Sequence, residues 1–284
     1  MKLNYKLITI LEGVDSNILG VFLVGLLFML IYFVWRMVEF RYVIAYKRPL
    51  YVHVPFLLKS LNKSQRAILR NKFTFYKKLY PKQQRFFEHR VASFIADKDF
   101  IGRGGVKVSE EMKVLISATA VMLTFGFRDF YIGLIDKIFI YPEAFYSNMN
   151  ESYHKGEFNP KLQALVLSWK DFEAGYEIEN DNLNLGIHEF AHAIHLNSYK
   201  EKDVSATIFA DSFKELIDLL AKDEGLRKAL IESEYFRNYA YTNQFEFIAV
   251  IIETFIETPK EFQSLFPEIY DKTKQMLNFH FAGY

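Results

Sequence analysis

The stretch NLGIHEFAHAIH, residues 184–195, places three histidines and one glutamate in an otherwise apolar run. His188, Glu189 and His192 form the pattern H-E-x-x-H. Side chains four residues apart lie above one another on a helix, so both imidazoles would project toward one point. Zinc accepts two such nitrogens and leaves room for other ligands. Glu189 would be offset around the helix, where it can reach a zinc-activated water without ligating the metal.

A core helix with two hydrogen-bonded histidines is the structural alternative. Apolar residues such as Ile187, Phe190 and Ile194 flank both histidines and would bury this helix. Buried imidazoles need polar partners, and one metal ion would supply a partner for both. The pattern therefore favours a metal site.

A hydrolytic zinc site needs a third protein ligand and an open position for water. His195 follows His192 by three residues, but three ligands along one straight helix do not readily converge on a tetrahedral ion. Extended zincin motifs carry a third histidine six residues after the second, and Ser198 occupies that position here. If His195 did complete a four-ligand shell, the zinc would be structural rather than catalytic.

The segment NQFEFIAVIIETF, residues 243–255, and the turn that follows offer a carboxylate as the third ligand. Glu246, Glu253 and Glu257 lie broadly on one face of the predicted helix. The rest of that face is apolar, which argues against an exposed acidic stripe. Glu246 also stands three residues after Asn243, so a capping role for Glu246 is the alternative.

Hydrophobic patterning elsewhere predicts an α+β fold that is mainly helical with a small sheet. Glycines mark a loop over 97–109, and Thr258, Pro259 and Glu261 predict a capping box. The strand ALVLSW, residues 164–169, would offer an edge that aligns a substrate peptide. We predict helices over 61–80, 82–97, 109–124, 206–225 and 243–257, and strands over 137–142 and 164–169.

Residues 18–35 form an uncharged apolar run close to the length that crosses a bilayer as a helix. Glu12 and Asp15 precede the run and bulky Trp35 closes it, which is not the pattern of a secretory signal peptide. A buried core helix is the other alternative. We expect this run to contact the lipid bilayer as a single-pass anchor.

Basic residues on the two sides of this run predict its orientation. Lys2 and Lys6 precede it, whereas four basic residues follow it within a short distance, and these are Arg36, Arg41, Lys47 and Arg48. The positive-inside rule therefore places the main body in the cytoplasm, attached to the cytoplasmic membrane. We divide the chain into an anchor with its juxtamembrane segment, 1–46, and one folded domain, 47–284.

Composition limits the possible metal ligands and binding partners. The 284 residues contain no cysteine, which excludes disulfides and thiolate ligands. The net charge of +1 hides a polarised chain, since the segment 47–90 contains twelve Lys or Arg residues and one acid. These cations would either attract anionic lipid or pair with the acidic remainder of the domain. No nucleic-acid partner is expected, because no recognition motif accompanies the charge.

Several motifs of this chain together resemble those of a known family. HEFAHAIH, with EFIAVIIETFIETP downstream, resembles the Mlc titration factor A family of zinc-dependent peptidases. GGVKVSEEMKVLISATA, IFIYPEAF and VLSWKDF resemble the same family in the same order, so the likeness covers about residues 70–275. The catalytic domain of anthrax lethal factor is similar at a greater distance, through H-E-F-x-H and YAYTNQFEF, residues 239–247.

The resemblance implies a zincin-like metallopeptidase domain over 47–284. It implies that His188, His192 and Glu246 bind zinc and that Glu189 is the general base. It also implies that Tyr239 donates a hydrogen bond to the developing oxyanion, with Tyr235 and Tyr241 as neighbouring alternatives.

The resemblance also frames the expected function. We expect a membrane-anchored, zinc-dependent metallopeptidase that hydrolyses peptide bonds of a peptide or protein substrate, with an aminopeptidase-like preference. The alternative is a regulatory binding protein that sequesters a transcriptional regulator, with proteolysis secondary, because the familiar family member is a cytosolic protein that binds a transcriptional repressor. Family members tend to carry aspartate where this chain has His195.

Overall fold

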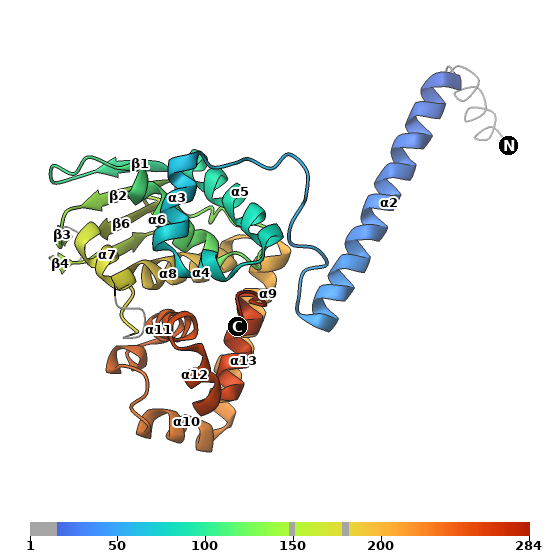
Figure 1. The fold of residues 1–284 in the computed structure, drawn as a ribbon. Helices are drawn as coiled ribbons and strands as arrows, with labels where there is room; N and C mark the ends of the chain where they lie inside the picture. Colours follow the sequence, from blue (N-terminus) through green and yellow to red (C-terminus); the bar gives the residue numbers. More distant parts are fainter. Residues whose placement is uncertain (1–15, 148–150, 178–181) are drawn as a thin grey trace. The chain divides into compact units, whose positions relative to one another are not determined.

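The structure is a computed structural model that describes residues 16–147, 151–177 and 182–284 (Figure 1). The chain divides into two compact units, Met1–Tyr46 and Lys47–Tyr284. The described part of the first unit is one helix, α2 (Ser16–Tyr46). The second unit contains the small sheet and all the remaining described helices.

Helix α2 is long and apolar enough over Ile18–Tyr46 to cross a membrane. Its 29 residues would span about 44 Å, more than the roughly 30 Å of a bilayer's hydrocarbon core. The helix runs past the predicted run of 18–35 because its polar end continues in helical form, with Arg36 Nη1 2.8 Å from Glu39 Oε2. A signal sequence would meet the same criteria of length and composition. Lys2 and Lys6 lie outside the described residues.

The second unit is mainly helical with a small sheet, as predicted. Its four-stranded sheet has the order β1-β2-β6-β5, with parallel β1–β2 and β2–β6 pairs and an antiparallel β6–β5 pair. The strands are β1 (Asp99–Gly102), β2 (Lys137–Tyr141), β5 (Gly156–Asn159) and β6 (Ala164–Ser168). A separate hairpin joins β3 (Phe145–Ser147) to β4 (Ser152–His154).

The two predicted strands are confirmed as β2 and β6, but two expectations about the sheet are wrong. The segment predicted as the loop 97–109 contains β1, a short strand that pairs with β2. Strand β6 is not an edge, because β2 and β5 take up its hydrogen bonds on both sides. The strand at that end of the sheet is β5, which carries too few apolar residues for patterning to reveal it.

Besides this sheet, the second unit contains eleven described helices and a short 3-10 helix, η1 (Asn238–Tyr241). The predicted helix 61–80 is interrupted because Phe73 adopts an extended backbone between α3 and α4. The predicted helix 206–225 ends earlier because Asp223 closes α9 and caps α10. The helices are α3 (Lys63–Lys72), α4 (Thr74–Lys78), α5 (Pro81–Asp97), α6 (Glu110–Leu123), α7 (Trp169–Glu177), α8 (Leu185–Lys200), α9 (Val204–Lys222), α10 (Glu224–Glu232), α11 (Gln244–Glu257), α12 (Pro259–Leu265) and α13 (Pro267–Met276).

The capping box predicted at the start of α12 does not form. Thr258 does occupy the N-cap position and Pro259 the first turn, but no side-chain cap bond forms. The Thr258 hydroxyl lies 3.1 Å from Asn182 Oδ1 instead. A tertiary hydrogen bond has therefore displaced the local one.

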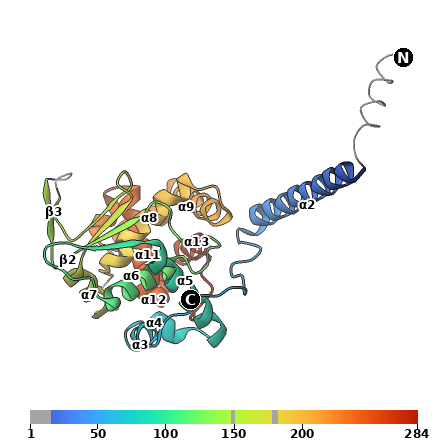
Figure 2. The same ribbon diagram turned by 90° about the horizontal axis from the view of Figure 1, so that it is seen from above.

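Helix α8 is enclosed by its neighbours. It packs against strands β5 and β6 on one side and against α11 on the other, and both views place it beside the sheet (Figure 1, Figure 2). Ile187, Phe190 and Ile194 are buried, as the flanking pattern predicted. A helix in this position can present its polar side chains only toward groups that the neighbouring elements supply.

One half-buried histidine, His53, lies far from this helix in the chain. The His53 ring stacks on Phe86 at 4.5 Å between centroids and contacts Phe125 at 4.8 Å. Its Nε2 is buried and has no hydrogen-bond partner among the described residues. Burial, together with the positive charge of Arg90, lowers the pKa of His53 to about 3.

His53 should therefore make the domain sensitive to acid. The unfolded chain takes up this proton below its ordinary pKa of about 6.5 while the folded chain does not. Stability should fall as pH drops from about 6.5 toward 3, by up to about 1.4 kcal/mol per pH unit from this group. His53→Phe should flatten that slope in denaturant-unfolding curves measured from pH 8 to pH 4, while any offset between variant and wild type stays constant above pH 7. Parallel curves over the whole range would contradict the prediction.

Candidate metal centre

Asn184, directly before α8, holds the start of this helix through hydrogen bonds to α8 itself, to α7 and to α11. Asn184 caps the helix, its Oδ1 accepting from the Ile187 N–H at 3.1 Å. Its Nδ2 donates to the Gly175 carbonyl at 2.7 Å, and its backbone N–H donates to Glu253 Oε1 on α11 at 2.9 Å. These bonds fix the rotation of α8 so that His188 and His192, one turn apart, face α11.

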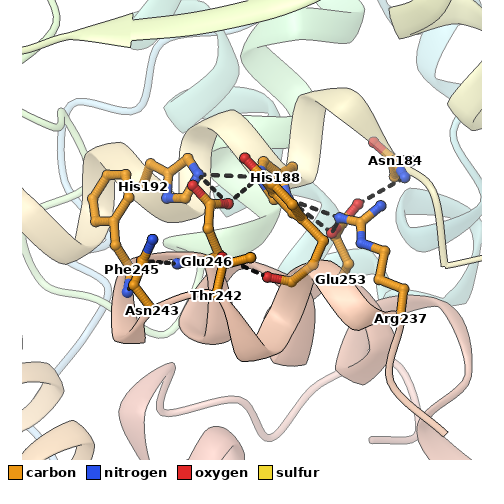
Figure 3. A network of polar contacts seen from close by, with 10 residues as sticks. Asn184, His188, His192, Arg237, Thr242, Asn243, Phe245, Glu246 and Glu253 are labelled. Atoms are coloured by element: carbon orange, nitrogen blue, oxygen red, sulfur yellow. Dashed lines mark hydrogen bonds and ion pairs between the residues drawn. The ribbon is translucent and has the colours of Figure 1, made fainter. Parts of the chain in front are cut away.

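The start of α11 is capped independently of its glutamate. Asn243 Oδ1 accepts from the N–H groups of Phe245 and Glu246 at 2.9 and 3.0 Å. The Glu246 side chain does not cap the helix, so the alternative role left open by the sequence is excluded. Its carboxylate points across to α8 instead (Figure 3).

His188, His192 and Glu246 converge on one point between the two helices (Figure 3). The two Nε2 atoms lie 3.0 Å apart, and Glu246 Oε2 lies 3.2 Å from that of His188 and 3.4 Å from that of His192. Three ligands at tetrahedral angles around an ion bound at 2.0–2.1 Å would be separated by about 3.3–3.4 Å. The spacing therefore fits a single small metal ion.

The chemistry of the three atoms agrees with this fit. Two imidazole nitrogens and one carboxylate oxygen, all largely buried, bring lone pairs together. Burial alone would lower the pKa of His188, but Glu246 and Glu253 overcome it and raise the pKa to about 9. Burial raises the pKa of Glu246, but the two histidines outweigh it and hold that pKa well below its usual range. The cluster thus attracts positive charge.

The second nitrogen of His188 has a carboxylate partner. His188 Nδ1 lies 2.9 Å from Glu253 Oε2, so a proton on Nδ1 leaves the Nε2 lone pair directed at the cluster. Arg237 Nη2 lies 3.0 Å from the same nitrogen and also contacts Glu253. Because Nδ1 donates to Glu253, we assign the Arg237 hydrogen bond to the carboxylate.

His192 is oriented by packing. Its ring stacks on Phe245 with a centroid distance of 3.9 Å and an interplanar angle of 4°. Its Nδ1 is buried and has no hydrogen-bond partner in the part of the chain that the structure describes. The residue that precedes Glu246 therefore positions the second histidine, a role that sequence reasoning missed.

Glu189 lies beside the three-atom cluster and is not part of it. Its side chain is buried against β5, where a Cβ added at Gly156 would stand 2.6 Å from Oε1. Only glycine at 156 leaves space for this carboxylate. Burial raises the pKa of Glu189 to about 7, and the charges of Glu246 and Glu253 add to the effect.

Of the three tyrosines considered from the sequence, Tyr239 faces the cluster. It lies on η1, half exposed, with its ring centroid 6.0 Å from that of His188. Burial and the nearby Glu246 carboxylate raise the pKa of Tyr239 to about 12, so its hydroxyl keeps its proton. Tyr235 lies 3.4 Å from the Thr258 hydroxyl, and Tyr241 donates to the Leu230 carbonyl at 3.0 Å.

His195 lies outside the cluster. Its ring packs against Phe213 at 4.7 Å, and its Nε2 lies 3.4 Å from the Tyr199 hydroxyl. Burial lowers the pKa of His195 to about 4, so it is neutral at physiological pH. A four-ligand structural site completed by His195 is therefore not what this geometry shows.

The three glutamates of α11 have separate places. Glu246 reaches the cluster, and Glu253 lies against Nδ1 of His188. Glu257 lies away from both and lines a separate small pocket with Tyr176. A spacing of seven residues puts Glu246 and Glu253 on the same face of α11, which is why both meet α8.

A cleft of about 380 Å³ opens beside the cluster. His188, Arg237 and Tyr239 line it near the cluster, and an ion pair of 2.7 Å between Lys155 and Asp171 lines it further away. A substrate bound in this cleft would touch His188 and Tyr239 together.

Comparison with known proteins agrees with this geometry. The model of the glucose-regulated metallopeptidase M90 family matches residues 56–278, most of the second unit. The chain belongs to this family. An uncharacterized protein of Synechocystis sp. is 26% identical over 226 residues, which cover 72% of this chain and 79% of that protein. The family resemblance read from the motifs is thereby confirmed, and in this metallopeptidase His188, His192 and Glu246 are positioned to bind a metal.

Glu253→Gln should weaken metal binding in this M90 chain. The amide is a poorer acceptor for His188 Nδ1–H and leaves Arg237 without its anion, and loss of such a partner typically costs 10–100-fold in metal affinity. Competition with a chelating dye would measure the change. Glu257→Gln, one turn further along α11, is the matched control and should keep the wild-type affinity. Equal affinities for both variants would contradict the assigned role.

Proposed function

We propose that the chain is a zinc-dependent peptidase that hydrolyses peptide bonds. The proposal rests on the convergence of His188, His192 and Glu246. The carboxylate of Glu189, which is not one of the three converging groups, is buried beside them. Two imidazoles and one carboxylate form a known catalytic zinc set, which leaves a further position open. An aminopeptidase-like preference rests on the family resemblance alone.

The bound ion would supply Lewis acidity, polarising the peptide carbonyl and lowering the pKa of water. His188, His192 and Glu246 hold it, and Glu253 sets the tautomer of His188. Glu189 takes a proton from the attacking water and delivers it to the leaving amine. Its burial between α8 and β5 limits its side chain to this position, because Gly156 provides the space.

Tyr239 is proposed as the oxyanion donor. Its hydroxyl keeps its proton, and the residue lines the cleft together with His188. A donor aimed at developing negative charge acts selectively in the transition state. Tyr235 and Tyr241 are occupied by Thr258 and the Leu230 carbonyl, which supports Tyr239 as the donor.

The end of the sheet next to α8 suggests how a substrate peptide is aligned. Strand β5 ends the order β1-β2-β6-β5 and packs on α8. An extended peptide added to such a strand gains main-chain hydrogen bonds without a fixed sequence. We therefore assign to β5 the aligning role that the sequence had suggested for β6.

Location is the remaining part of the proposal. Helix α2 would anchor the chain in the cytoplasmic membrane as a single span, with the peptidase unit facing the cytoplasm. The length of α2 supports a span, and the excess of basic residues after it supports the orientation.

Glu189→Gln should separate catalysis from metal binding. The amide cannot accept the proton, so hydrolysis of test peptides should fall about 10²–10⁴-fold. Zinc content should stay at the wild-type level, whereas Glu246→Gln should lose both metal and activity. Peptide-cleavage assays paired with metal analysis of the purified chain provide the two readouts.

Full hydrolysis by Glu189→Gln would refute the general-base role. A second outcome concerns the role of the chain in the cell. If cellular function survived in a Glu189→Gln variant without activity, the chain would act mainly as a regulatory binding protein that sequesters a transcriptional regulator.

Tyr239→Phe should lower kcat about 10²–10³-fold, because one oxyanion donor is lost. Metal content should not change, since the tyrosine is not one of the three converging ligands. Tyr235→Phe and Tyr241→Phe are the matched controls on either side in the sequence and should keep most of the wild-type kcat. A Tyr239→Phe variant as active as these two would rule out the assignment.

A further inference from the structure

A loop at the start of the second unit is anchored at both ends by α5. Arg90 Nη2 donates to the Val52 carbonyl at 3.0 Å, and the next residue, His53, stacks on Phe86. At the other end, the Lys59 N–H donates to His89 Nδ1 at 2.9 Å. Residues 54–57 between these anchors are therefore held in a defined place.

The part between the anchors projects apolar side chains into solvent. The exposed fractions are 53% for Val54, 74% for Phe56 and 96% for Leu57. Leu57 also has a φ of 55°, a conformation that residues with a Cβ rarely adopt. We call Val54, Phe56 and Leu57 the apolar tip. Exposed apolar side chains held in a fixed and unfavourable backbone conformation indicate a binding role.

Exposed cations lie close to the tip in the sequence and near its anchors on α5. Lys59 follows Leu57 by two residues, and its hydrogen-bond partner His89 lies one helical turn beyond Arg85 on α5. Lys82 starts the same helix, and Lys78 ends the helix before it. Lys59, Lys78, Lys82 and Arg85, which we call the cationic row, are all exposed.

The cationic row is not neutralised by the domain itself. Some basic residues of this segment do pair with acids, such as Arg66 with Glu88 and Lys72 with Glu111. Among the described residues, Lys78, Lys82 and Arg85 form no ion pair within 4.0 Å. Glu88, the one acid of the segment 47–90, is buried. Pairing within the domain, one of the two alternatives left open by the sequence, is therefore confirmed for some of these cations. Attraction of the remaining cations to anionic lipid stays a prediction.

We propose that the apolar tip and the cationic row bind the surface of an anionic lipid bilayer. Cations near such a surface are attracted to its headgroups, while the apolar side chains lose contact with water. An exposed apolar tip whose anchoring helix also carries exposed cations fits a surface that is negative outside and hydrocarbon beneath. An acidic protein partner would satisfy the charges but not the tip.

The chain itself keeps this surface within reach of a bilayer, and this step rests on the proposed span of α2. The helix ends at Tyr46, ten residues before Phe56. Ten residues of extended chain cover at most about 36 Å. The tip can therefore reach the headgroups of the membrane that α2 crosses, so that binding is intramolecular and needs little intrinsic affinity.

The absence of cysteine allows a sharp test with the full chain. Leu57→Cys, labelled with an apolar environment-sensitive fluorophore, is reconstituted into vesicles of phosphatidylcholine alone or with phosphatidylserine. We expect a blue-shifted emission, quenched by spin-labelled lipid, in the anionic vesicles. The same label at Leu162→Cys, another exposed leucine of the domain, should remain in water in both.

Charge reversal tests the cationic row. Lys82→Glu with Arg85→Glu should lower the ratio of docked to undocked label by more than about 25-fold, since loss of each cation alone costs about fivefold and the two new anions are repelled as well. Lys222→Glu with Lys260→Glu, two exposed lysines of α9 and α12, changes the net charge equally and should leave the ratio unchanged.

Three results would overturn the proposal. One is a label at position 57 that stays in water in both kinds of vesicle, and another is a reversal pair that behaves like its control. The third is an equal shift caused by added polyglutamate in neutral vesicles, which would assign the surface to an acidic protein.

Alkaline extraction of the vesicles reads the span of α2 separately. If the chain is extracted but the label still shifts in anionic vesicles, the proposed lipid-binding surface stands and the proposed span of α2 is wrong. Peptide hydrolysis is measured on the same preparations, so failure of the peptidase proposal is visible independently.

Discussion

The contact between α8 and α11 is the constraint on which the site depends. Glu253 accepts both the backbone N–H of Asn184, where α8 begins, and the Nδ1 proton of His188 one turn later. One carboxylate thereby sets the rotation of the helix and the direction of a ligand. Glu246, two turns earlier on α11, then meets the nitrogens that this rotation presents. The candidate metal centre results from the packing of two helices rather than from either motif alone.

The sheet adds the opposite wall. Strand β5 brings its backbone so close to α8 at Gly156 that no side chain fits there, and the Glu189 carboxylate occupies the space. Burial in this position raises the pKa of Glu189 toward neutrality. A peptide laid along β5 would pass close to this carboxylate, to which we assign the proton transfers of the proposed reaction. Substrate alignment and general-base catalysis would therefore share one structural cause.

The H-E-x-x-H helix and the strands β2 and β6 could be predicted because their signals are local, namely helical spacing and runs of β-forming residues. The carboxylates of α11 could be placed on one face by spacing, but not assigned to separate roles, because those roles depend on how α11 meets α8. Strand β1 was missed, and β5 escaped patterning, since each is four residues long and depends on its neighbours. The Thr258 cap failed for a related reason, as a partner distant in sequence, Asn182, took the hydroxyl.

The face-to-face contact between Phe245 and His192 has a consequence for how such a site is inherited or transplanted. Asn243 caps α11, Phe245 stacks on the His192 ring, and Glu246 contributes its carboxylate to the candidate metal centre, all within a single turn. Inserting or deleting one residue in this turn would rotate the Phe245 ring and the carboxylate away together by about 100°. Residues 243–246 would therefore have to be transferred together. A graft that moves Glu246 without Phe245 would supply the carboxylate but leave the His192 ring without the side chain that orients it.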